Sequence, residues 1–376
     1  MRPKAFSSLA SALVTAALVV AACGGGVAPT TSQIATGTTA APTTSASAPA
    51  ATATVSPAPT AAPTAAPTAP PTLKPTVAGV QNGRIAYAVR ASDGSSNIFS
   101  VLPDGSGELQ LTTDSGNHLC AAYSADGTRI AYCADAGGRF EIWTMQADGT
   151  KQAQVTHLAG RSLFPDFSPD GKRIAFEGPV GADEHTNIHV VDASTGKGLR
   201  TLTTCEGMAA GCANNYPAWS PDGKTIVFAH QDNYIGDAPV NQQIWIMDGD
   251  GGHQHALTTG AAPKDQLPSW SPDGKSIVYA SGGPDGEGIW VMAADGSGQV
   301  QLSGCAPDKT SPCAAGSDFG PVWSPDGTRI AFLRAFGAVG ANDRPVYVMN
   351  ADGTDQQRLT PGTILATVPG WQRLDL

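Results

Sequence analysis

Basic residues are scarce in this 376-residue chain, which contains 22 lysines and arginines against 32 aspartates and glutamates. The formal net charge is −10, and the lysines and arginines form no long run. Nucleic-acid-binding domains carry a basic patch or stripe, and polybasic segments dock proteins to anionic lipid. The charge balance therefore argues against both kinds of partner.

Two catalytic patterns are also missing. The chain has no Gly-x-Ser-x-Gly sequence, in which α/β-hydrolases expose a nucleophilic serine. A peptidase assignment therefore has no support. The sequence also offers no set of three histidines that would converge on one metal ion.

One short pattern is present six times. It consists of an aromatic residue followed by Ser-x-Asp-Gly, and its last copy is truncated to Val-Pro-Gly-Trp-Gln at 368–372. Successive aromatic anchors are 44 to 53 residues apart. The anchors are Tyr123, Phe167, Trp219, Trp270, Trp323 and Trp371. A period of this size with several short strands per unit is typical of a β-propeller.

The unit from Pro217 to Thr258 predicts four short strands, called a to d below. Pro-Ala-Trp-Ser forms strand a, and Ser-Pro-Asp-Gly reverses the chain. Lys-Thr-Ile-Val-Phe is the β-branched and aromatic strand b. Gln-Ile-Trp-Ile-Met and His-Ala-Leu-Thr form strands c and d. Four strands of this length match one propeller blade.

The ends of the repeat region predict how the ring closes. The region begins at Gly83 with a strand b and stops at Trp371 with a strand a. A C-terminal strand that completes the first blade would remove both exposed edges. The sequence therefore predicts an all-β, six-bladed β-propeller of four-stranded blades. A pair of β-sandwiches is the alternative, but a sandwich does not need the same turn six times.

These residues resemble the TolB-type six-bladed propeller. Ser324 to Phe332, Val346 to Gly353 and Arg358 to Thr360 are similar to the family repeat nearly position by position. The resemblance covers about 81–376. It implies a periplasmic propeller that binds an outer-membrane lipoprotein. TolB also carries an N-terminal α/β domain, which this sequence lacks, and related propellers precede an α/β-hydrolase domain in some peptidases.

The N-terminus predicts export and lipidation. Residues 1–22 combine a basic start with an apolar stretch that ends in Val-Ala-Ala, directly before Cys23. This arrangement predicts a lipoprotein signal peptide at 1–22 and an acylated Cys23, which would anchor the chain to a membrane. An ordinary cleaved signal and an uncleaved anchor are the alternatives. The expected location is the outer side of the cytoplasmic membrane or the outer membrane.

Residues 23–80 predict a stalk between the anchor and the propeller at 81–376. The stretch consists almost entirely of Ala, Thr, Pro, Ser and Gly. Such a composition cannot bury a core, and frequent proline favours extended conformations. Its threonines and prolines also permit O-glycosylation.

The six remaining cysteines fall into three local pairs in an exported chain, which favours disulfides. The pairs are Cys120 with Cys133, Cys205 with Cys212, and Cys305 with Cys313. Cys120 lies opposite Cys133 if the hairpin turn has two residues, whereas a bulge would shift this register by one. Metal ligation is the alternative, but these spacings do not match zinc ribbons.

The loops predict which face of the propeller binds a partner. The a–b and c–d turns are short and uniform, whereas the b–c and d–a loops hold nearly all the length variation. Function usually lies on variable loops carried by a rigid scaffold. The expected binding face therefore holds these loops. Its candidate residues are His230, Asp232, Tyr234, Arg334, Phe336 and Arg344.

Polar residues also occur three positions before the proline position of strand a, where we expect the mouth of the central channel. They include His118, Asn214, Asp265 and Asp318. Facing carboxylates with Asn and His nearby would suit a hard cation such as Ca²⁺. Turn capping or water binding is the simpler interpretation, and no metal or other cofactor is required. Asp166 is the charged exception within strand a, and its role stays open.

The combined features favour a membrane-anchored, non-enzymatic scaffold. Its partner would be an envelope protein or a cell-wall or surface glycan, with membrane contact through the lipid anchor only. A closed propeller satisfies its own strand edges, so we expect a monomer. The alternative is a metal-dependent lactonase- or lyase-like enzyme at the channel mouth, for which only His118, Asp265 and Asp318 are suitable.

Overall fold

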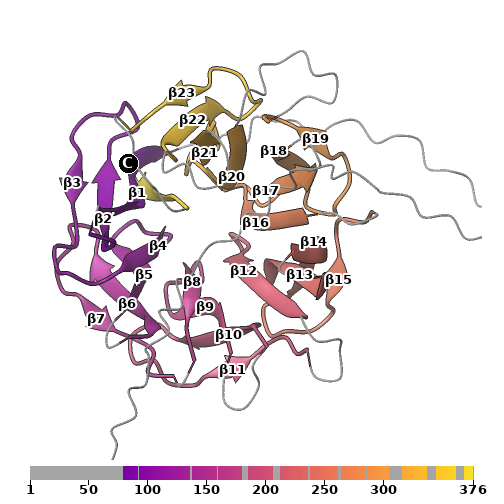
Figure 1. Ribbon diagram of the computed structural model, residues 1–376, viewed down its shortest axis with the longest axis horizontal. Helices are drawn as coiled ribbons and strands as arrows, with labels where there is room; N and C mark the ends of the chain where they lie inside the picture. The colour runs from indigo at the N-terminus through magenta and orange to yellow at the C-terminus, as the bar shows by residue number, and fades with distance from the viewer. Residues whose placement is uncertain are drawn as a thin grey trace, which may run out of the picture. The chain divides into compact units, whose positions relative to one another are not determined.

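The described part of the chain forms strands and turns, and no helix occurs in it (Figure 1). In this computed structural model the described residues are 79–91, 93–135, 138–158, 160–179, 185–205, 212–235, 238–260, 264–283, 286–304, 316–336, 344–360 and 368–375. The predicted signal peptide, Cys23 and the stalk lie outside them.

Four blades are separate four-stranded sheets (Figure 1). The first contains β24 (Gly370–Asp375), β1 (Val80–Arg90), β2 (Ser96–Val101) and β3 (Leu109–Gln110). The second contains β4 (His118–Tyr123), β5 (Arg129–Asp135), β6 (Phe140–Gln146) and β7 (Ala153–Gln154). The third contains β8 (Leu163–Phe167), β9 (Arg173–Gly178), β10 (Asn187–Asp192) and β11 (Arg200–Thr201). The last contains β20 (Gly316–Trp323), β21 (Arg329–Phe336), β22 (Val346–Asn350) and β23 (Gln357–Arg358).

The fourth and fifth repeats share one eight-stranded sheet. The fourth contributes β12 (Ala213–Trp219), β13 (Thr225–Ile235), β14 (Ala238–Asp248) and β15 (His255–Ala256). The fifth contributes β16 (Lys264–Trp270), β17 (Ser276–Gly283), β18 (Gly286–Ala293) and β19 (Val300–Gln301). The long hairpin of β13 and β14 reaches far enough for Gln242 to pair in parallel with Lys264. The all-β propeller is therefore confirmed, but the expected six separate four-stranded sheets are corrected to four, plus one sheet of eight strands.

The C-terminal strand closes the first blade, as the sequence predicts. Strand β24 pairs antiparallel with β1. Trp371 donates its Nε1–H to the carbonyl of Gly83 at 3.2 Å, and Gln372 accepts a hydrogen bond from Arg84 N at 3.1 Å. Residues almost 290 positions apart in sequence are thus held in one sheet.

The repeated Ser-x-Asp-Gly turns have one hydrogen-bond pattern, which the first turn illustrates. The hydroxyl of Ser124 donates to Asp126 Oδ1 at 2.5 Å and accepts from Arg129 N at 3.0 Å. Gly127 follows with φ of +67°, and a Cβ there would lie 1.9 Å from the carbonyl oxygen of Arg373. Glycine is thus required both by the backbone conformation and by the neighbouring strand.

The Leu-Thr ending of the repeats also has a structural role. In each repeat, a strand-d hydroxyl accepts the backbone N–H of an apolar residue in strand c. Thr360, for example, accepts from Val346 N at 3.0 Å, and Thr156 accepts from Ile142 N at 2.8 Å. The equivalent acceptors are Thr112, Thr203, Thr258 and Ser303. These hydrogen bonds stabilise the pairing of each two-residue strand d with strand c of its blade.

Strand a has a β-bulge in front of its aromatic anchor. Cys120, Phe164, Tyr216 and Leu267 have φ between +48° and +57°, and the register of each strand shifts at that point. An extra residue in one strand of a pair changes which side chains point to a given face. These bulges therefore decide which residues face the centre of the ring.

Apolar side chains pack between neighbouring blades. Trp219, for example, is buried with Ala175 of the preceding blade and Phe228 of its own blade. Trp323 is buried with Val278 of the fifth repeat in the same way. The aromatic anchors of the repeat thus form the core that joins the blades.

Candidate functional site

The centre of the ring is lined by strand-a residues from all repeats and encloses a cavity of about 180 Å³. Its wall is mainly apolar and includes the bulge residues Cys120, Phe164, Tyr216 and Leu267. The rings of Phe164 and Tyr216 meet edge to face, with their centroids 4.6 Å apart. The predicted channel residues His118, Asn214, Asp265 and Asp318 are not part of this lining.

Asn214 and Asp318 are instead buried and bonded to side chains of their own and the preceding repeat, since Asn214 also donates to Asn187 Oδ1 at 3.0 Å. Asn214 Oδ1 contacts His230 Nδ1 at 2.8 Å. Asp318 accepts two hydrogen bonds from Arg334, at 2.6 and 2.7 Å, and a third from Ser303 Oγ at 2.7 Å. The bond with Asp318 raises the pKa of Arg334 above its ordinary value.

Asp265 and His118 also have local partners. Burial raises the pKa of Asp265, while hydrogen bonds from Ser281 and Thr258 partly oppose that rise. His118 Nδ1 contacts the carbonyl of Ser96 at 3.1 Å, and its Nε2 is 3.3 Å from Asp114. The described residues contain no group of three or more His, Cys, Asp or Glu side chains suited to a metal ion. The prediction that these four residues converge at one channel mouth is thus corrected. Each of them precedes the β-bulge of its strand, and residues at or after the bulge line the channel instead.

The candidate binding-face residues divide into buried and accessible ones. His230 is buried against Trp245, with ring centroids 4.5 Å apart, and burial lowers its pKa although Asp232 opposes the change. Arg334 is held by Asp318. The predicted exposure of His230 is therefore corrected, because its ring lies in the blade interior, whereas Arg334 is half-buried with 21% of its side chain exposed. Asp232 is exposed.

The other candidates lie near the loop ends. Phe336 is half-buried, with its ring centroid 6.1 Å from that of Tyr347. Arg344 is half-buried over the ring of Phe319 at 5.7 Å, and burial lowers its pKa. The backbone of Tyr234 belongs to β13, and its side chain lies outside the described part.

The cysteine pairs have different outcomes. Cys205 and Cys212 form a disulfide. Cys120 and Cys133 are free and buried, so the predicted bond between them is corrected. The bulge pairs Cys133 with Leu119 rather than with Cys120. Burial, followed by the hydrogen bond with Cys120, raises the pKa of the Cys133 thiol. Cys305 and Cys313 lie outside the described residues.

Two carboxylates connect the third and fourth repeats, of which Glu177 is buried and Asp166 is half-buried at the central cavity. Asp166 Oδ2 accepts the N–H of Trp219, and Glu177 Oε2 accepts the N–H of Tyr216, both at 2.7 Å. Burial raises the pKa of each carboxyl group to about 7, against the opposing effect of these bonds. For Asp166 this answers the open question of its role, since it bonds the neighbouring strand. Glu177 could not be recognised from the sequence, because it occupies an ordinary strand-b position.

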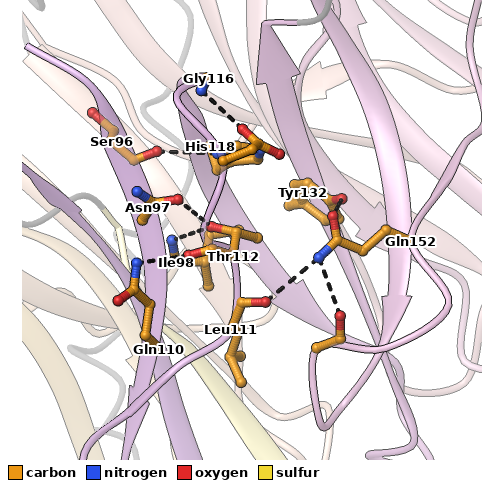
Figure 2. A network of polar contacts seen from close by, with 12 residues as sticks. Ser96, Asn97, Ile98, Gln110, Leu111, Thr112, Gly116, His118, Tyr132 and Gln152 are labelled. Carbon is orange, nitrogen blue, oxygen red and sulfur yellow. Dashed lines mark hydrogen bonds and ion pairs between the residues drawn. The ribbon is translucent and has the colours of Figure 1, made fainter.

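A second cavity, of about 480 Å³, lies in the second blade beside the polar network of Figure 2. His118 lies between Ser96 and Tyr132 in this view, and Tyr132 donates a hydrogen bond to Gln152 at 3.3 Å. Asp135 and Trp143 also line the cavity. This site is not visible in the sequence, because its residues come from two loops, from β4, β5 and β6, and from Gln152 before β7.

Comparison with known proteins identifies the family. Residues 78–233 and 144–314 match the model of the TolB beta propeller domain, and together these ranges cover more than half of the chain.

Within the part that the structure describes, no helix is long and apolar enough to span a membrane.

Two relatives show how far the sequence likeness extends. Dipeptidyl-peptidase 5 of Porphyromonas gingivalis is 30% identical over 237 residues, covering 53% of this chain and 35% of the relative. The Tol-Pal system protein TolB of Anaeromyxobacter dehalogenans is 30% identical over 132 residues, covering 34% of this chain and 26% of the relative. The chain thus spans about a third or less of the length of these two relatives.

Solved structures share the fold. TolB from Acinetobacter baumannii has a TM-score of 0.59 and 23% identity, covering 77% of this chain and 66% of that one. A TolB-like protein from Agrobacterium tumefaciens has a TM-score of 0.56 and 17% identity, covering 79% of this chain and 99% of that one. Since the family model matches most of the repeat region and the structure has the propeller architecture, the chain belongs to the TolB β-propeller domain family.

Proposed function

We propose that this protein is a non-enzymatic binding scaffold, held outside the cytoplasm by a lipidated Cys23 and a stalk at 23–80. In this proposal the eight-stranded sheet counts as two blades, which gives a six-bladed disc at 81–376. The b–c and d–a loops form its binding face. Its partner is an envelope protein or a cell-wall or surface glycan.

The observation that carries the proposal is that polar residues predicted for the channel mouth are paired with neighbouring side chains and do not converge on one point. Asn214 pairs with His230, and Asp318 pairs with Arg334, each inside one blade. A catalytic site requires acid, base or metal-binding groups that converge on one reacting atom. These pairs stiffen the disc beneath the loops instead, which favours binding over lactonase- or lyase-like chemistry.

The family supports a role in the cell envelope. One relative is named for the Tol-Pal system, and the A. baumannii structure is a TolB. Dipeptidyl-peptidase 5 shares only its matched region with this chain, and that region contains no Gly-x-Ser-x-Gly sequence. The peptidase activity in its name is therefore not transferred.

Site-specific photo-cross-linking in intact cells tests the proposal. A photoreactive residue at Phe336 lies on the proposed binding face, whereas one at Asp295, in an exposed c–d turn, provides the matched control on the opposite face. We expect Phe336 to capture one identified envelope component and Asp295 not to capture it. Equal capture from both faces would refute the assignment of the binding face. The variant Cys23→Ser should release the protein from the membrane fraction.

A further inference from the structure

The central cavity carries a single carboxylate in an otherwise uncharged wall. Among the described residues that line its volume of about 180 Å³, Asp166 is the only aspartate, and no glutamate, lysine, arginine or histidine occurs there. Four aromatic residues belong to the same wall, namely Tyr123, Phe164, Tyr216 and Trp371. The cavity thus combines one negative charge with aromatic and aliphatic surface.

The repeat itself does not require a carboxylate at position 166. The residue directly before the aromatic anchor in the other repeats is Ala122, Ala218, Ser269, Val322 or Gly370. Asp166 Oδ2 accepts the N–H of Trp219 in the next repeat at 2.7 Å. The anchors Trp270 and Trp323 form the same ladder pairs as Trp219, although the repeats before them offer no carboxylate. The bond to Trp219 is therefore not needed to build a blade.

The charge of Asp166 is poorly compensated by the protein. Burial raises the pKa of its carboxyl group to about 7, and the groups that oppose this rise are the backbone N–H groups of Trp219 and Phe167. The guanidinium of Arg129 lies 4.8 Å over the ring of Phe167, and that of Arg173 lies 4.4 Å over the ring of Trp219. A desolvated carboxylate without a counter-charge is unfavourable, and a cation in the cavity would reduce this cost.

Two aromatic rings come from the strands that hold Asp166 and its partner. Phe164 precedes Asp166 by two residues in β8, and Tyr216 lies in β12. The two rings meet edge to face, an arrangement in which only one face of one ring is covered by the other ring. Phe164, Asp166 and Tyr216 are all half-buried, so each retains accessible surface at the cavity. The negative face of an aromatic ring attracts a cation, most strongly where both groups are desolvated.

We propose that the central cavity binds a quaternary ammonium group, such as the trimethylammonium head of choline. The inference goes beyond the proposed scaffold function, because it assigns a small-molecule ligand to the centre of the ring. A trimethylammonium group has no N–H donor, so it needs only a negative charge and aromatic or aliphatic surface. Guanidinium and lysine ammonium groups would bring five and three N–H donors that require acceptors. The cavity volume of about 180 Å³ lies below the roughly 300 Å³ of drug-sized pockets, which favours a small head group.

Titration calorimetry of the purified full chain with choline chloride at pH 8, compared with sodium chloride at the same ionic strength, tests the inference. The alcohol 3,3-dimethylbutan-1-ol has the shape of choline but no charge, and we expect it to bind at least about tenfold more weakly. Ethanolamine, a strongly hydrated primary ammonium ion, should also bind more weakly. Glycerophosphocholine distinguishes two sources of the group. Binding as tight as that of choline would indicate a phospholipid head group, and binding of choline alone would indicate a soluble amine.

Two substitutions separate the charge from the aromatic surface. Asp166→Asn keeps an acceptor oxygen for Trp219 but removes the charge, and it should weaken choline binding at least about tenfold. Phe164→Leu removes one ring and should weaken binding about fivefold. Leucine is accepted at this bulge, since Leu267 occupies the equivalent position, so this variant decides the matter if Asp166→Asn does not fold. Asp295→Asn, in an exposed c–d turn, is the matched control and should leave binding unchanged.

The pH dependence of binding links the ligand to Asp166. Since the cation binds the ionised carboxylate, whose pKa is about 7, choline should bind about tenfold more tightly at pH 8 than at pH 6. Titratable side chains on the strands packed against β8 include Cys120 and Tyr123 of β4, Cys133 of β5, Glu141 of β6, Glu177 of β9 and Tyr216 of β12. Of these, Glu177 also has a pKa raised to about 7. Asp166→Asn leaves Glu177 in place and should nevertheless lose most of the pH dependence.

Four outcomes would overturn the inference. They are the absence of choline binding at millimolar concentrations, equal binding of the neutral alcohol, unchanged binding in both Asp166→Asn and Phe164→Leu, and a full pH dependence in Asp166→Asn, which would assign the titration to Glu177. The cross-linking experiment probes a loop and the calorimetry probes the centre of the ring. Either experiment can therefore fail without changing the conclusion from the other.

Discussion

Replacing Glu177 by Gln should make the protein more stable at pH 8 while leaving its stability at pH 5 nearly unchanged. Glu177 is 4% exposed, and its Oε2 accepts the N–H of Tyr216 at 2.7 Å. Burial raises the pKa of its carboxyl group from 4.5 to about 7, while the Tyr216 bond and the charge of Arg161 oppose that rise. Glutamine is nearly isosteric, keeps an acceptor oxygen for Tyr216 and cannot ionise.

The sign of the effect follows from proton linkage. Between pH 4.5 and about 7 the folded state retains the Glu177 proton, whereas the unfolded state has lost it. The stability contributed by this group therefore falls as pH rises through that range. A pKa increase of about 2.5 units corresponds to about 3 kcal/mol, since each unit is worth about 1.4 kcal/mol. Part of this effect already occurs below pH 5. Between pH 5 and pH 8 the free energy of unfolding of Glu177→Gln should therefore fall by about 2.5 kcal/mol less than that of the unchanged protein.

Equilibrium urea unfolding at pH 5, 6, 7 and 8, followed by tryptophan fluorescence, measures this difference. Asp166, whose pKa is also raised to about 7, should leave part of the pH dependence in the variant. Asp104→Asn is the control, because Asp104 is an exposed carboxylate whose pKa is lowered by its bonds with Ser106. The same pH dependence in Glu177→Gln and the unchanged protein would refute the argument.

Three further predictions concern the blades themselves. Thr360→Val should lower the free energy of unfolding by about 1–3 kcal/mol, because it removes the buried acceptor of Val346 N. Denaturant unfolding measures this loss, and an unchanged midpoint and slope would contradict it. Gly127→Ala should prevent closure of the first blade or strongly lower the thermal midpoint, since its Cβ would lie 1.9 Å from Arg373 O. A variant as stable as the original protein would show that β24 does not need to pack against the Gly127 turn. Cys133 should resist iodoacetamide at pH 8 until the protein unfolds, because it is fully buried and its thiol pKa is raised; rapid labelling of Cys133 in the native protein, measured by peptide mass spectrometry, would argue against that burial.

Much of the candidate site could not be derived from the sequence because side-chain direction depends on strand register. His118 and Asp318 were expected at the channel, whereas the bulges place Cys120 and Leu267 there instead. A displacement of one residue moves side chains to the opposite face of a strand. The sequence alone does not reveal where the extra residue is accommodated. The same shift separates Cys120 from Cys133 in the ladder.

The sequence by itself determined the propeller blade and its closure. The Ser-x-Asp-Gly turns form within a few residues, and the strands recur at a regular spacing, so both can be recognised from the sequence alone. The Trp371 segment is recognised in the same way as a strand a that lacks its own blade and pairs with the first one. Only the tertiary structure decided which blades join, which polar groups pair and where cavities remain. A cavity remains beside His118 in the second blade, and Glu177 bonds a strand almost 40 residues away. Such contacts depend on the relative positions of distant segments, which are set by packing rather than by local conformational preference.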